Sequence, residues 1–456
     1  MIDTNVEFCL NDLNEVVMLF GSGEEFKIRH RLTESEGKVV NTVTVNGKVF
    51  AYGNLVKAFK DEIERKRLIK RYAKLSLYKA LVRFTGKELP WGALTGIRPT
   101  KLAYQQIAEQ GDFKEFFIDT MKVSSEKTTL TEAVLNTQKG IYGTDDDFTD
   151  FFVFIPFCPS RCKYCSFISA DIKSAQKHVD EYVDALIEEI NYSKQFVKKL
   201  RSIYIGGGTP VALSDEQLDR VLTAIDTINT GVEYTVEAGR PDRITESNLK
   251  ILKKHGVTRI CINPQTFNDK TLELLGRNHT ALDVEEKFAL AKNDFIVNMD
   301  LIAGLNGESF DDFKYSLDKS VALSPDNITV HTLCIKRGSY LSETEDRLSG
   351  EQVEKMVDYA YKTLTENDYS PYYLYRQKYM AGNLENVGYC KKGKASIYNI
   401  DVMEEISSTV ACGANAISKR VFNGGERIER QASPKDVVTY LNKLEIIKEQ
   451  KRKLFS

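Results

Sequence analysis

Three cysteines of this chain, Cys158, Cys162 and Cys165, lie within eight residues with the spacing CxxxCxxC. Thiolates are soft ligands, and a short loop with three of them can bind three irons of a 4Fe–4S cluster, which normally takes four cysteines. The fourth iron then keeps an open coordination position. Such an iron can bind the amino and carboxylate groups of S-adenosylmethionine, next to a cluster that can pass one electron into a carbon–sulfur bond. The spacing therefore predicts a redox centre that generates a carbon radical.

A tetrahedral zinc site is the first alternative, and it needs a fourth ligand beside the three thiolates. Ser166 and Phe167 follow Cys165 directly, and the nearest histidine, His178, falls in the next predicted helix. Unrelated buried thiols are the second alternative. The spacing favours the cluster over both. The other cysteines have no CxxC spacing, and we expect them to be buried thiols: Cys9, Cys261, Cys334, Cys390 and Cys412.

Apolar runs alternate with amphipathic stretches from Phe151 to about Tyr375. The runs predict strands at Phe151–Ile155, Ile203–Ile205, Tyr234–Glu237, Ile260–Asn263, Val297–Ile302 and Ile328–Leu333. Helices are predicted between them, near Ala175–Lys199, Asp215–Ile228, Glu246–His255, Asp283–Lys292, Phe310–Leu323 and Glu351–Asn367. This alternation is typical of parallel strands with crossover helices, which form a partial or complete α/β barrel. Because such barrels place their sites at the carboxyl ends of the strands, the cysteine loop after the first strand lies where a site is expected.

Polar residues that could form a site follow the later strands. Gly206-Gly207-Gly208-Thr209-Pro210 comes after the second strand, and its missing side chains let backbone groups approach a ligand closely. Glu237 ends the third strand, where its carboxylate can accept from an ammonium or a ribose hydroxyl. Gln265, Arg277 and Asp300 lie at or just beyond the fourth and fifth strands. Taken singly, the glycine run is compatible with a turn, Arg277 with a surface ion pair and Asp300 with a helix cap, but their shared position favours a site.

The cysteine motif, with an aromatic residue before its third cysteine, resembles that of the radical S-adenosylmethionine superfamily. Ile155-Pro156-Phe157-Cys158 and the glycine run resemble, more narrowly, the oxygen-independent coproporphyrinogen III dehydrogenase (oxidase) family. The whole chain looks most like its HemZ-type branch. The resemblance runs from about Trp91 to about Lys419.

The resemblance implies a fold, two cofactors and a set of site residues. The fold is α/β, a partial (β/α)6 radical-SAM barrel with a mixed α/β N-terminal domain and a mostly helical C-terminal region. The three cysteines of the motif would hold the 4Fe–4S cluster. By the same resemblance, the glycine motif binds the methionine amino group, Gln265 and Asp300 bind the adenosyl portion, and Arg277 binds a carboxylate. The implied contacts to S-adenosylmethionine are Phe152, Tyr164, Gly207, Gly208, Thr209, Glu237, Gln265, Arg277 and Asp300; the family often has Tyr where this chain has Phe152.

The family's reaction, carried over, removes hydrogen from a propionate side chain with a 5'-deoxyadenosyl radical and releases carbon dioxide to leave a vinyl group. Two such events convert coproporphyrinogen III to protoporphyrinogen IX in haem biosynthesis. The expected partners are a porphyrinogen or haem-like tetrapyrrole and a low-potential electron donor such as flavodoxin or ferredoxin. A substrate with four carboxylates needs cations, for which the candidates are Arg98, Arg161, Arg240, Lys336, Arg337 and Arg376. We expect Lys336 and Arg337 to engage a propionate.

Two alternative functions remain open. The family's dehydrogenases carry another cysteine two positions after the third, and this chain has Phe167 there. The same substitution is common in a related branch that binds haem, which makes a cluster-containing haem carrier the first alternative. The second is a radical enzyme that modifies RNA, suggested by an excess of basic residues in Lys57–Lys101, although such a charge run usually marks a solvated helix face. His331, on the sixth strand, is expected to be a core histidine, with proton transfer or tetrapyrrole binding as its alternative roles.

Length and composition limit which partners, which cell compartment and how many domains we expect for this chain. The 456 residues include 63 Lys and Arg against 65 Asp and Glu, so the net charge of −2 gives no general reason to expect nucleic acid as a partner. We expect a cytoplasmic chain, because no apolar run is long enough to span a membrane and Met1 is not followed by a secretory signal. The acidic run Thr144–Asp147 resembles a linker and predicts a domain boundary, and the alternating pattern ends near Tyr375, so the predicted domains are 1–147, 148–375 and 376–456. In the first, the sequence predicts a hairpin around Asn46-Gly47 and a helix over Asp61–Arg83.

Overall fold

The computed structural model describes residues 2–21, 25–35, 37–55, 59, 61–95, 98–165, 170–334, 348–377 and 380–456. The chain forms two compact units. The N-terminal unit comprises Met1–Glu132 and Gly382–Leu384, and the barrel unit comprises Ala133–Ala381 and Glu385–Ser456. The division at residues 132 and 133 falls inside helix α4 (Ser125–Gln138). The three-domain division predicted from the sequence remains a proposal.

The N-terminal unit contains a sheet with the strand order β1 (Ile2–Thr4), β2 (Ile28–Ser35), β3 (Lys38–Val45) and β4 (Lys48–Leu55). The predicted hairpin joins β3 to β4, and both turn residues have positive φ, 45° at Asn46 and 88° at Gly47, as a tight hairpin turn requires. The predicted helix is α2 (Glu62–Thr85), which begins after Asp61, whose side chain accepts from the backbone of Glu64. Helices α1 (Leu10–Met18) and α3 (Pro99–Gln110) belong to the same unit.

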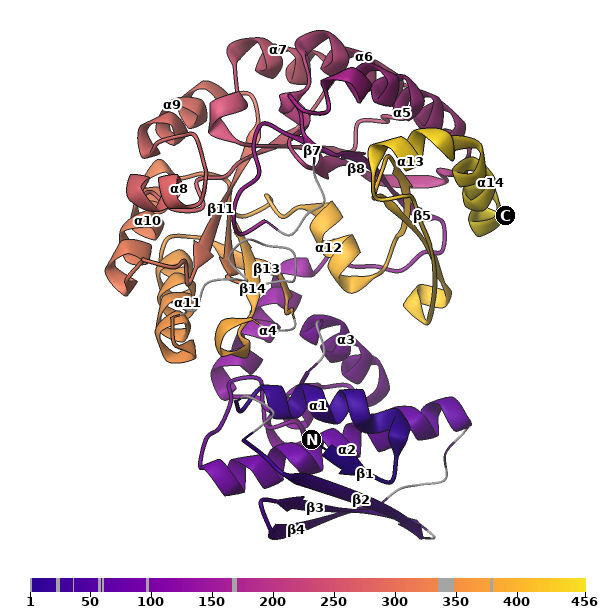
Figure 1. Ribbon diagram of the computed structural model, residues 1–456, viewed down its shortest axis with the longest axis vertical. Helices are drawn as coiled ribbons and strands as arrows, with labels where there is room; N and C mark the ends of the chain where they lie inside the picture. Colours follow the sequence, from indigo (N-terminus) through magenta and orange to yellow (C-terminus); the bar gives the residue numbers. More distant parts are fainter. Residues whose placement is uncertain are drawn as a thin grey trace. The chain divides into compact units, whose positions relative to one another are not determined.

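All the predicted barrel strands are present and parallel. They are β5 (Phe148–Ile155), β8 (Lys199–Gly207), β9 (Glu233–Gly239), β10 (Arg259–Ile262), β11 (Ile296–Ala303) and β12 (Asn327–Thr332), paired in that order. The helices predicted between them are α5 (Val179–Ser193), α6 (Asp215–Asp226), α7 (Glu246–Lys254), α9 (Ala281–Ala291) and α10 (Phe310–Leu323), with α11 (Gly350–Glu366) after β12. In Figure 1 these helices follow one another around the outside of the strands. The predicted partial barrel is therefore confirmed.

The C-terminal region extends this sheet at both edges. Strand β14 (Asn386–Cys390) pairs with β12 and with β13 (Ser370–Tyr375), while β15 (Ser408–Cys412) pairs with β5 and leads to β16 (Ile417–Phe422) and β17 (Arg427–Ala432). The expectation of a mostly helical region after residue 375 thus needs correction. Its helices are α12 (Ile397–Glu404), α13 (Val437–Asn442) and α14 (Leu444–Phe455), and strands accompany them.

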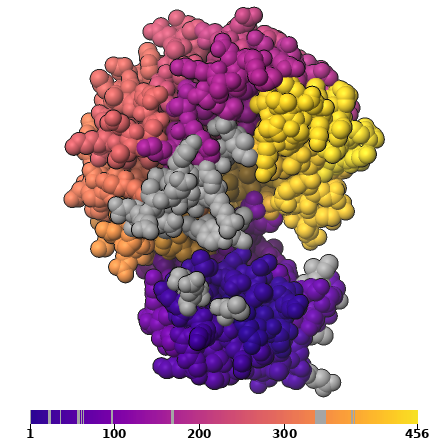
Figure 2. Space-filling view, in the orientation of Figure 1, coloured from indigo at the N-terminus to yellow at the C-terminus, as the bar shows by residue number. Residues whose placement is uncertain are grey.

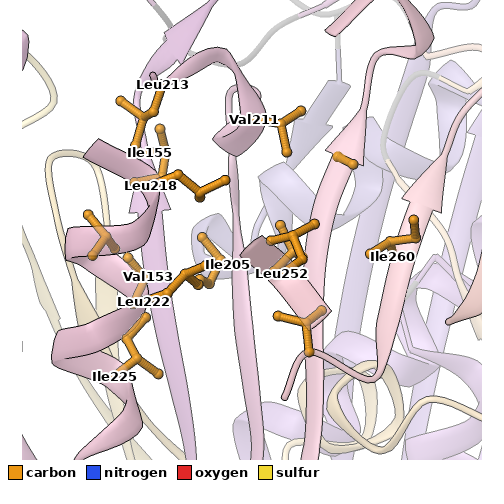
Figure 3. Packing of buried hydrophobic residues seen from close by; sticks show 14 of the residues in the cluster. Val153, Ile155, Ile205, Val211, Leu213, Leu218, Leu222, Ile225, Leu252 and Ile260 are labelled. Atoms are coloured by element: carbon orange, nitrogen blue, oxygen red, sulfur yellow. The ribbon is translucent and has the colours of Figure 1, made fainter. Parts of the chain in front are cut away.

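Alternation along the strands separates an outer apolar face from an inner face of polar and aromatic side chains. Val153 and Ile155 of β5 and Ile205 of β8 pack against Leu218 and Leu222 of α6, and all five are nearly inaccessible to solvent (Figure 3). The intervening residues of the same strands point to the inside of the barrel. Because the apolar residues point outward, the residues between them in the sequence are the ones whose side chains can form a site inside the barrel.

Helix α12 connects the two edges of the sheet and contacts both β8 and β13. Glu233, the first residue of β9, accepts hydrogen bonds from the Ser396 hydroxyl at 2.8 Å and from the backbone nitrogens of Ile397 and Tyr398 at 3.1 and 3.2 Å. A carboxylate at a helix N-terminus accepts hydrogen bonds from the unpaired backbone donors and interacts favourably with the positive end of the helix dipole. Because Glu233 begins its strand, this contact places the start of α12 at the amino ends of the barrel strands.

Helix α14 is anchored to the barrel by a buried ion pair. The Lys451 ammonium lies 2.8 Å from the carboxylate of Glu189 on α5, and both side chains are fully buried. In the space-filling view, the C-terminal segment (yellow) lies beside the magenta part of the same unit (Figure 2). Within the described ranges, no helix is long and apolar enough to cross a membrane.

Candidate cluster and cofactor site

The cysteine loop follows β5 at its carboxyl end. Its short strand β6 (Phe157–Cys158) pairs with β7 (Ala170–Asp171), and the Lys163 nitrogen donates to the Leu275 carbonyl at 3.0 Å. Cys162 is buried, and Cys158 and Cys165 are half-buried. The loop thus presents two of its thiols at the surface of the site.

The three thiols of the cysteine loop are the ligands that the sequence predicts for the cluster. Zinc needs all its ligands on a single ion, whereas each cysteine of a 4Fe–4S cluster binds a different iron. The donor set fits the cluster. Of the isolated cysteines, Cys9, Cys261, Cys390 and Cys412 are buried as expected, and Cys334 is half-buried.

The glycine run packs directly against the cysteine loop. The Gly208 nitrogen donates to the Ile155 carbonyl at 2.7 Å, and the Thr209 nitrogen donates to the Phe157 carbonyl at 2.7 Å. A Cβ on Gly208 would lie 2.4 Å from the Phe157 oxygen, and Gly207 has a φ of +107°. Larger residues would therefore push the two loops apart. The Thr209 hydroxyl also donates to the Cys158 sulfur at 3.6 Å.

Arg277 connects the cysteine loop to two strand ends. Its Nη1 donates to the Tyr164 hydroxyl at 2.9 Å, and its Nη2 donates to the carbonyls of Gly239 and Asn263 at 3.1 and 2.7 Å. Arg277 is 6% exposed. The structure therefore shows Arg277 binding the loop that carries Tyr164, while its expected contact with a carboxylate remains a proposal.

Arg240 contacts the same loop from the end of β9. Its guanidinium forms a two-bond ion pair with Asp242, and its Nη1 lies 3.1 Å from the Ser160 hydroxyl and 3.5 Å from the Cys162 sulfur. Arg240 was expected among the cations for a substrate carboxylate. In the structure its donors face the cysteine loop and Asp242 instead.

The Glu237 and Asp300 carboxylates lie close enough inside the barrel for the charge of Asp300 to raise the pKa of Glu237. Burial and the charge of Asp300 raise the pKa of Glu237 to about 7, although a hydrogen bond from Tyr204 lowers it. Burial also raises the pKa of Asp300, but the nearby His331 and the side chain of Asn298 lower it more, so that it lies below its usual value. His331 Nε2 is 3.6 Å from the Asp300 carboxylate. The expected core histidine therefore adjoins the predicted site.

Gln265 occupies a strained position beside Asp300. Its φ is +67°, which is uncommon for a residue with a Cβ. Its nitrogen donates to the Asp300 carbonyl at 2.8 Å, and its carbonyl accepts from Ile302 at 3.0 Å. Nearby on the same loop, the buried Asn263 side-chain oxygen has no hydrogen-bond partner. An unsatisfied buried acceptor at this position suits a polar ligand.

Three stacked aromatic rings lie next to these carboxylates, on the side toward the amino ends of the barrel strands. The Tyr204 and Tyr398 rings are 4.1 Å apart at 21°, and Phe152 stacks on both at 6.1 Å. We call Phe152, Tyr204 and Tyr398 the aromatic floor. Because Tyr398 belongs to α12, the C-terminal region fills the interior beneath the predicted cofactor site.

Comparisons with known proteins decide the family. The sequence model of the radical SAM superfamily matches residues 152–319. The chain is 36% identical over 441 residues to the oxygen-independent coproporphyrinogen-III oxidase-like protein HemZ of Bacillus subtilis (strain 168), covering 90% of this chain and 87% of that protein. The chain belongs to the radical SAM superfamily, in the HemZ-type family. The resemblance seen in the sequence is thereby confirmed, and it covers more of the chain than the stretch from Trp91 to Lys419 over which it was expected.

Other radical SAM proteins are similar over smaller parts of the chain. The heme chaperone HemW of Lactococcus lactis subsp. lactis (strain IL1403) is 33% identical over 228 residues, 48% of this chain and 59% of that protein. In structure, the coproporphyrinogen III oxidase HemN of Escherichia coli matches with a TM-score of 0.54 at 20% identity, covering 72% of this chain and 74% of that one. At this identity the HemN likeness supports the fold.

Radical SAM proteins use a 4Fe–4S cluster and S-adenosylmethionine, and the residues present fit both. The three cysteines supply thiolates, the glycine run provides the close backbone approach, and the polar side chains at the strand ends supply hydrogen-bonding groups. The structure brings these elements to the same end of the barrel. The individual contacts to S-adenosylmethionine predicted from the sequence remain proposals.

Some residues of the site were missed by sequence reasoning. Tyr204 has the same inward alternation as Gly206 and could have been found from it, whereas Tyr398 comes from a distant helix with no local signal. The contact of Arg240 with Cys162 was also missed. Phe167, Lys336 and Arg337 lie outside the described residues, so the predictions that involve them are unchanged.

Proposed function

We propose that this protein catalyses the oxygen-independent oxidative decarboxylation of coproporphyrinogen III to protoporphyrinogen IX. The observation that carries the proposal is the 36% identity over 90% of the chain to a protein named as coproporphyrinogen-III oxidase-like. The match extends well beyond the radical SAM segment at residues 152–319, so it includes regions outside the segment shared across the superfamily.

When bound, the cluster and S-adenosylmethionine supply a radical reactive enough to remove hydrogen from an unactivated C–H bond. In this proposal Glu237 and Asp300 hold the adenosyl or methionyl polar groups, and the aromatic floor closes the interior below them. Closure from below excludes water and leaves the carboxyl ends of the strands as the route for a substrate.

Two of the cations expected to hold the substrate carboxylates, Arg240 and Arg376, are buried in the structure. Arg376 is 3% exposed, and burial lowers its pKa to about 10. Arg240 is also buried and is paired with Asp242. The proposal therefore places the propionate contacts on the remaining candidates, Arg98, Arg161, Lys336 and Arg337, of which Lys336 and Arg337 are still the pair expected to engage a propionate.

The test is anaerobic incubation of the reconstituted protein with dithionite, S-adenosylmethionine and coproporphyrinogen III. We expect 5'-deoxyadenosine and carbon dioxide together with a vinyl-containing product, detected by mass spectrometry. A Cys162→Ala variant should give none of these. Formation of 5'-deoxyadenosine without any change in the porphyrinogen would contradict the assigned substrate while leaving the radical SAM assignment intact.

A haem carrier is the second candidate function. It is favoured by Phe167 in place of a further cysteine and by the similarity to proteins named heme chaperone. A haem titration followed by the Soret absorption separates the two functions. Tight, stoichiometric haem binding without turnover of coproporphyrinogen III would favour the carrier.

A further inference from the structure

We propose that Arg240, held in place by Asp242, donates a hydrogen bond to the Cys162 thiolate and makes the 4Fe–4S cluster easier to reduce. Arg240 is in this role a positioning and tuning residue. The proposal concerns the cluster alone and goes beyond the proposed function, so it stands or falls independently of the substrate.

The contact lies in a part of the site from which solvent is excluded. Arg240 is 4% exposed and Cys162 is 8% exposed. The Nη1 of Arg240 is 3.5 Å from the Cys162 sulfur and 3.1 Å from the Ser160 hydroxyl, both on the cysteine loop. A charge-assisted hydrogen bond is stronger in such surroundings than in water.

Asp242 fixes the direction of the guanidinium. Arg240 Nε donates to one carboxylate oxygen at 2.8 Å, and Nη2 donates to the other at 3.1 Å. This bidentate pairing leaves Nη1 directed at the cysteine loop. The backbone is fixed as well, since the Arg240 nitrogen donates to the Ala238 carbonyl at 2.6 Å and its carbonyl accepts from Arg243 at 2.9 Å.

Reduction of the cluster adds one electron, taken from a low-potential one-electron donor, and no covalent bond is formed or broken. The added negative charge spreads onto the cysteine sulfurs, where a cationic N–H donor stabilises it more than it stabilises the oxidised cluster. Hydrogen bonds to sulfur are among the factors that set the potential of such clusters. Cys158 receives its hydrogen bond from the neutral hydroxyl of Thr209, so the charged contact at Cys162 should have the larger effect.

The test is a redox titration of the reconstituted full-length protein, followed by the EPR signal of the reduced cluster without S-adenosylmethionine. Arg240→Gln should lower the ratio of reduced to oxidised cluster at a fixed potential about tenfold, which for one electron is a midpoint about 59 mV lower. Arg240→Lys keeps the positive charge but loses the planar guanidinium that pairs with Asp242. It should lower the ratio of reduced to oxidised cluster about threefold.

Arg161→Gln is the matched control. It removes one positive charge from an exposed side chain next to Cys162, and solvent screening should limit its effect to less than about twofold. Iron content and circular dichroism confirm that each variant is loaded and folded. A wild-type midpoint in Arg240→Gln, or an equal shift in Arg161→Gln, overturns the proposal. If Arg240→Gln fails to retain the cluster, Arg240→Lys decides, since a wild-type midpoint there also overturns it.

Discussion

The Tyr204 hydroxyl donates a hydrogen bond to the Glu237 carboxylate inside the barrel. Burial raises the pKa of Glu237 to about 7, although this hydrogen bond lowers it. Glu237 therefore changes its charge near neutral pH, at the end of the strand that precedes the Arg240 loop. A carboxylate with this property makes both ligand binding and stability depend on pH.

We expect the affinity for S-adenosylmethionine to rise with pH up to about pH 7 and then to level off. The ionised Glu237 attracts a cationic ligand, whereas the protonated form does not, so affinity should change about tenfold per pH unit well below the pKa. Glu237→Gln should remove this component and weaken binding about tenfold or more at pH 8, the loss expected for a charged hydrogen bond. Anaerobic calorimetry of the reconstituted protein measures both effects.

Glu246→Gln is the control for that prediction, because Glu246 is an exposed residue on α7. Its pH profile should match that of the wild type. A Glu237→Gln variant that keeps the wild-type pH profile would show that Glu237 does not contact the ligand. Tyr204→Phe should move the rise in affinity to higher pH, because it removes the hydrogen bond that lowers the pKa of Glu237.

The same group should make the ligand-free protein less stable as pH rises through 7. Folding raises the pKa of Glu237 from 4.5 to about 7, so the folded state binds the proton more tightly. The resulting stabilisation is complete below pH 4.5 and is lost as pH rises through about 7. It amounts to at most about 3 kcal/mol.

Urea unfolding between pH 5 and 8 measures this dependence. Glu308, whose pKa is also raised to about 7 by burial, contributes in the same direction. Each single change to Gln should therefore flatten part of the pH dependence, and the double variant should flatten more. An unaltered slope in Glu237→Gln would mean that Glu237 has an ordinary pKa in the folded protein.

The barrel could be predicted because its strands are apolar runs and its helices are amphipathic. Parallel strands bring their carboxyl ends to one edge, which is why Glu237 and Asp300 could be expected to meet although 62 positions separate them. The strands that the C-terminal region adds at the edges of the sheet have no comparable apolar pattern in the sequence. Arg427–Ala432 has exposed or half-exposed side chains throughout and is predominantly polar, so its pairing with β16 depends on contacts that the local sequence does not reveal.

The charge runs were also difficult to interpret from the sequence. The acidic run before the first barrel strand predicts a linker, yet Asp146 accepts hydrogen bonds from the backbone of Asn423 and Gly424 at 3.1 Å. In the basic segment that suggested RNA, Lys70 pairs with Asp12 at 3.0 Å. Partners far away in the sequence determine what each run does, and local composition cannot identify them.

Gly208→Ala should disrupt the site by separating the glycine run from the cysteine loop. The added Cβ would lie 2.4 Å from the Phe157 carbonyl oxygen, so the backbone must move. We expect a loss of about 1–3 kcal/mol in stability, as for other overpacked positions, together with reduced iron content after reconstitution. Gly143→Ala is the control, because nothing lies within 4 Å of its Cβ position. Normal iron content in Gly208→Ala would show that the two loops adjust independently.

Tyr398→Ala should open the aromatic floor. The half-buried Tyr398 ring stacks on Tyr204 at 4.1 Å, and its removal takes away this stack. Loss of a fully buried aromatic ring costs about 3–5 kcal/mol, so we expect a loss of about 2–3 kcal/mol for this half-buried one. Tyr398→Phe keeps the stack and should cost less than about 1.5 kcal/mol. Urea unfolding measures both values, and equal losses in the two variants would assign the effect to the hydroxyl instead of the ring.

Lys451→Met should destabilise the packing of α14 on the barrel more than any surface change on the same helix. It leaves the fully buried Glu189 carboxylate without its cation, although Tyr440 still donates to it at 2.6 Å. Breaking one side of a buried ion pair costs about 3–5 kcal/mol. The added change Glu189→Gln removes the unpaired charge and should recover more than half of that loss. Lys453→Met is the matched control, because the exposed Lys453 pairs with Glu449 on the surface of the same helix, and the change should cost less than about 1 kcal/mol. If the double variant is no more stable than Lys451→Met, the lysine contributes through its packing and its hydrogen bonds to Ser193 and Ala411, and not through the charge of Glu189.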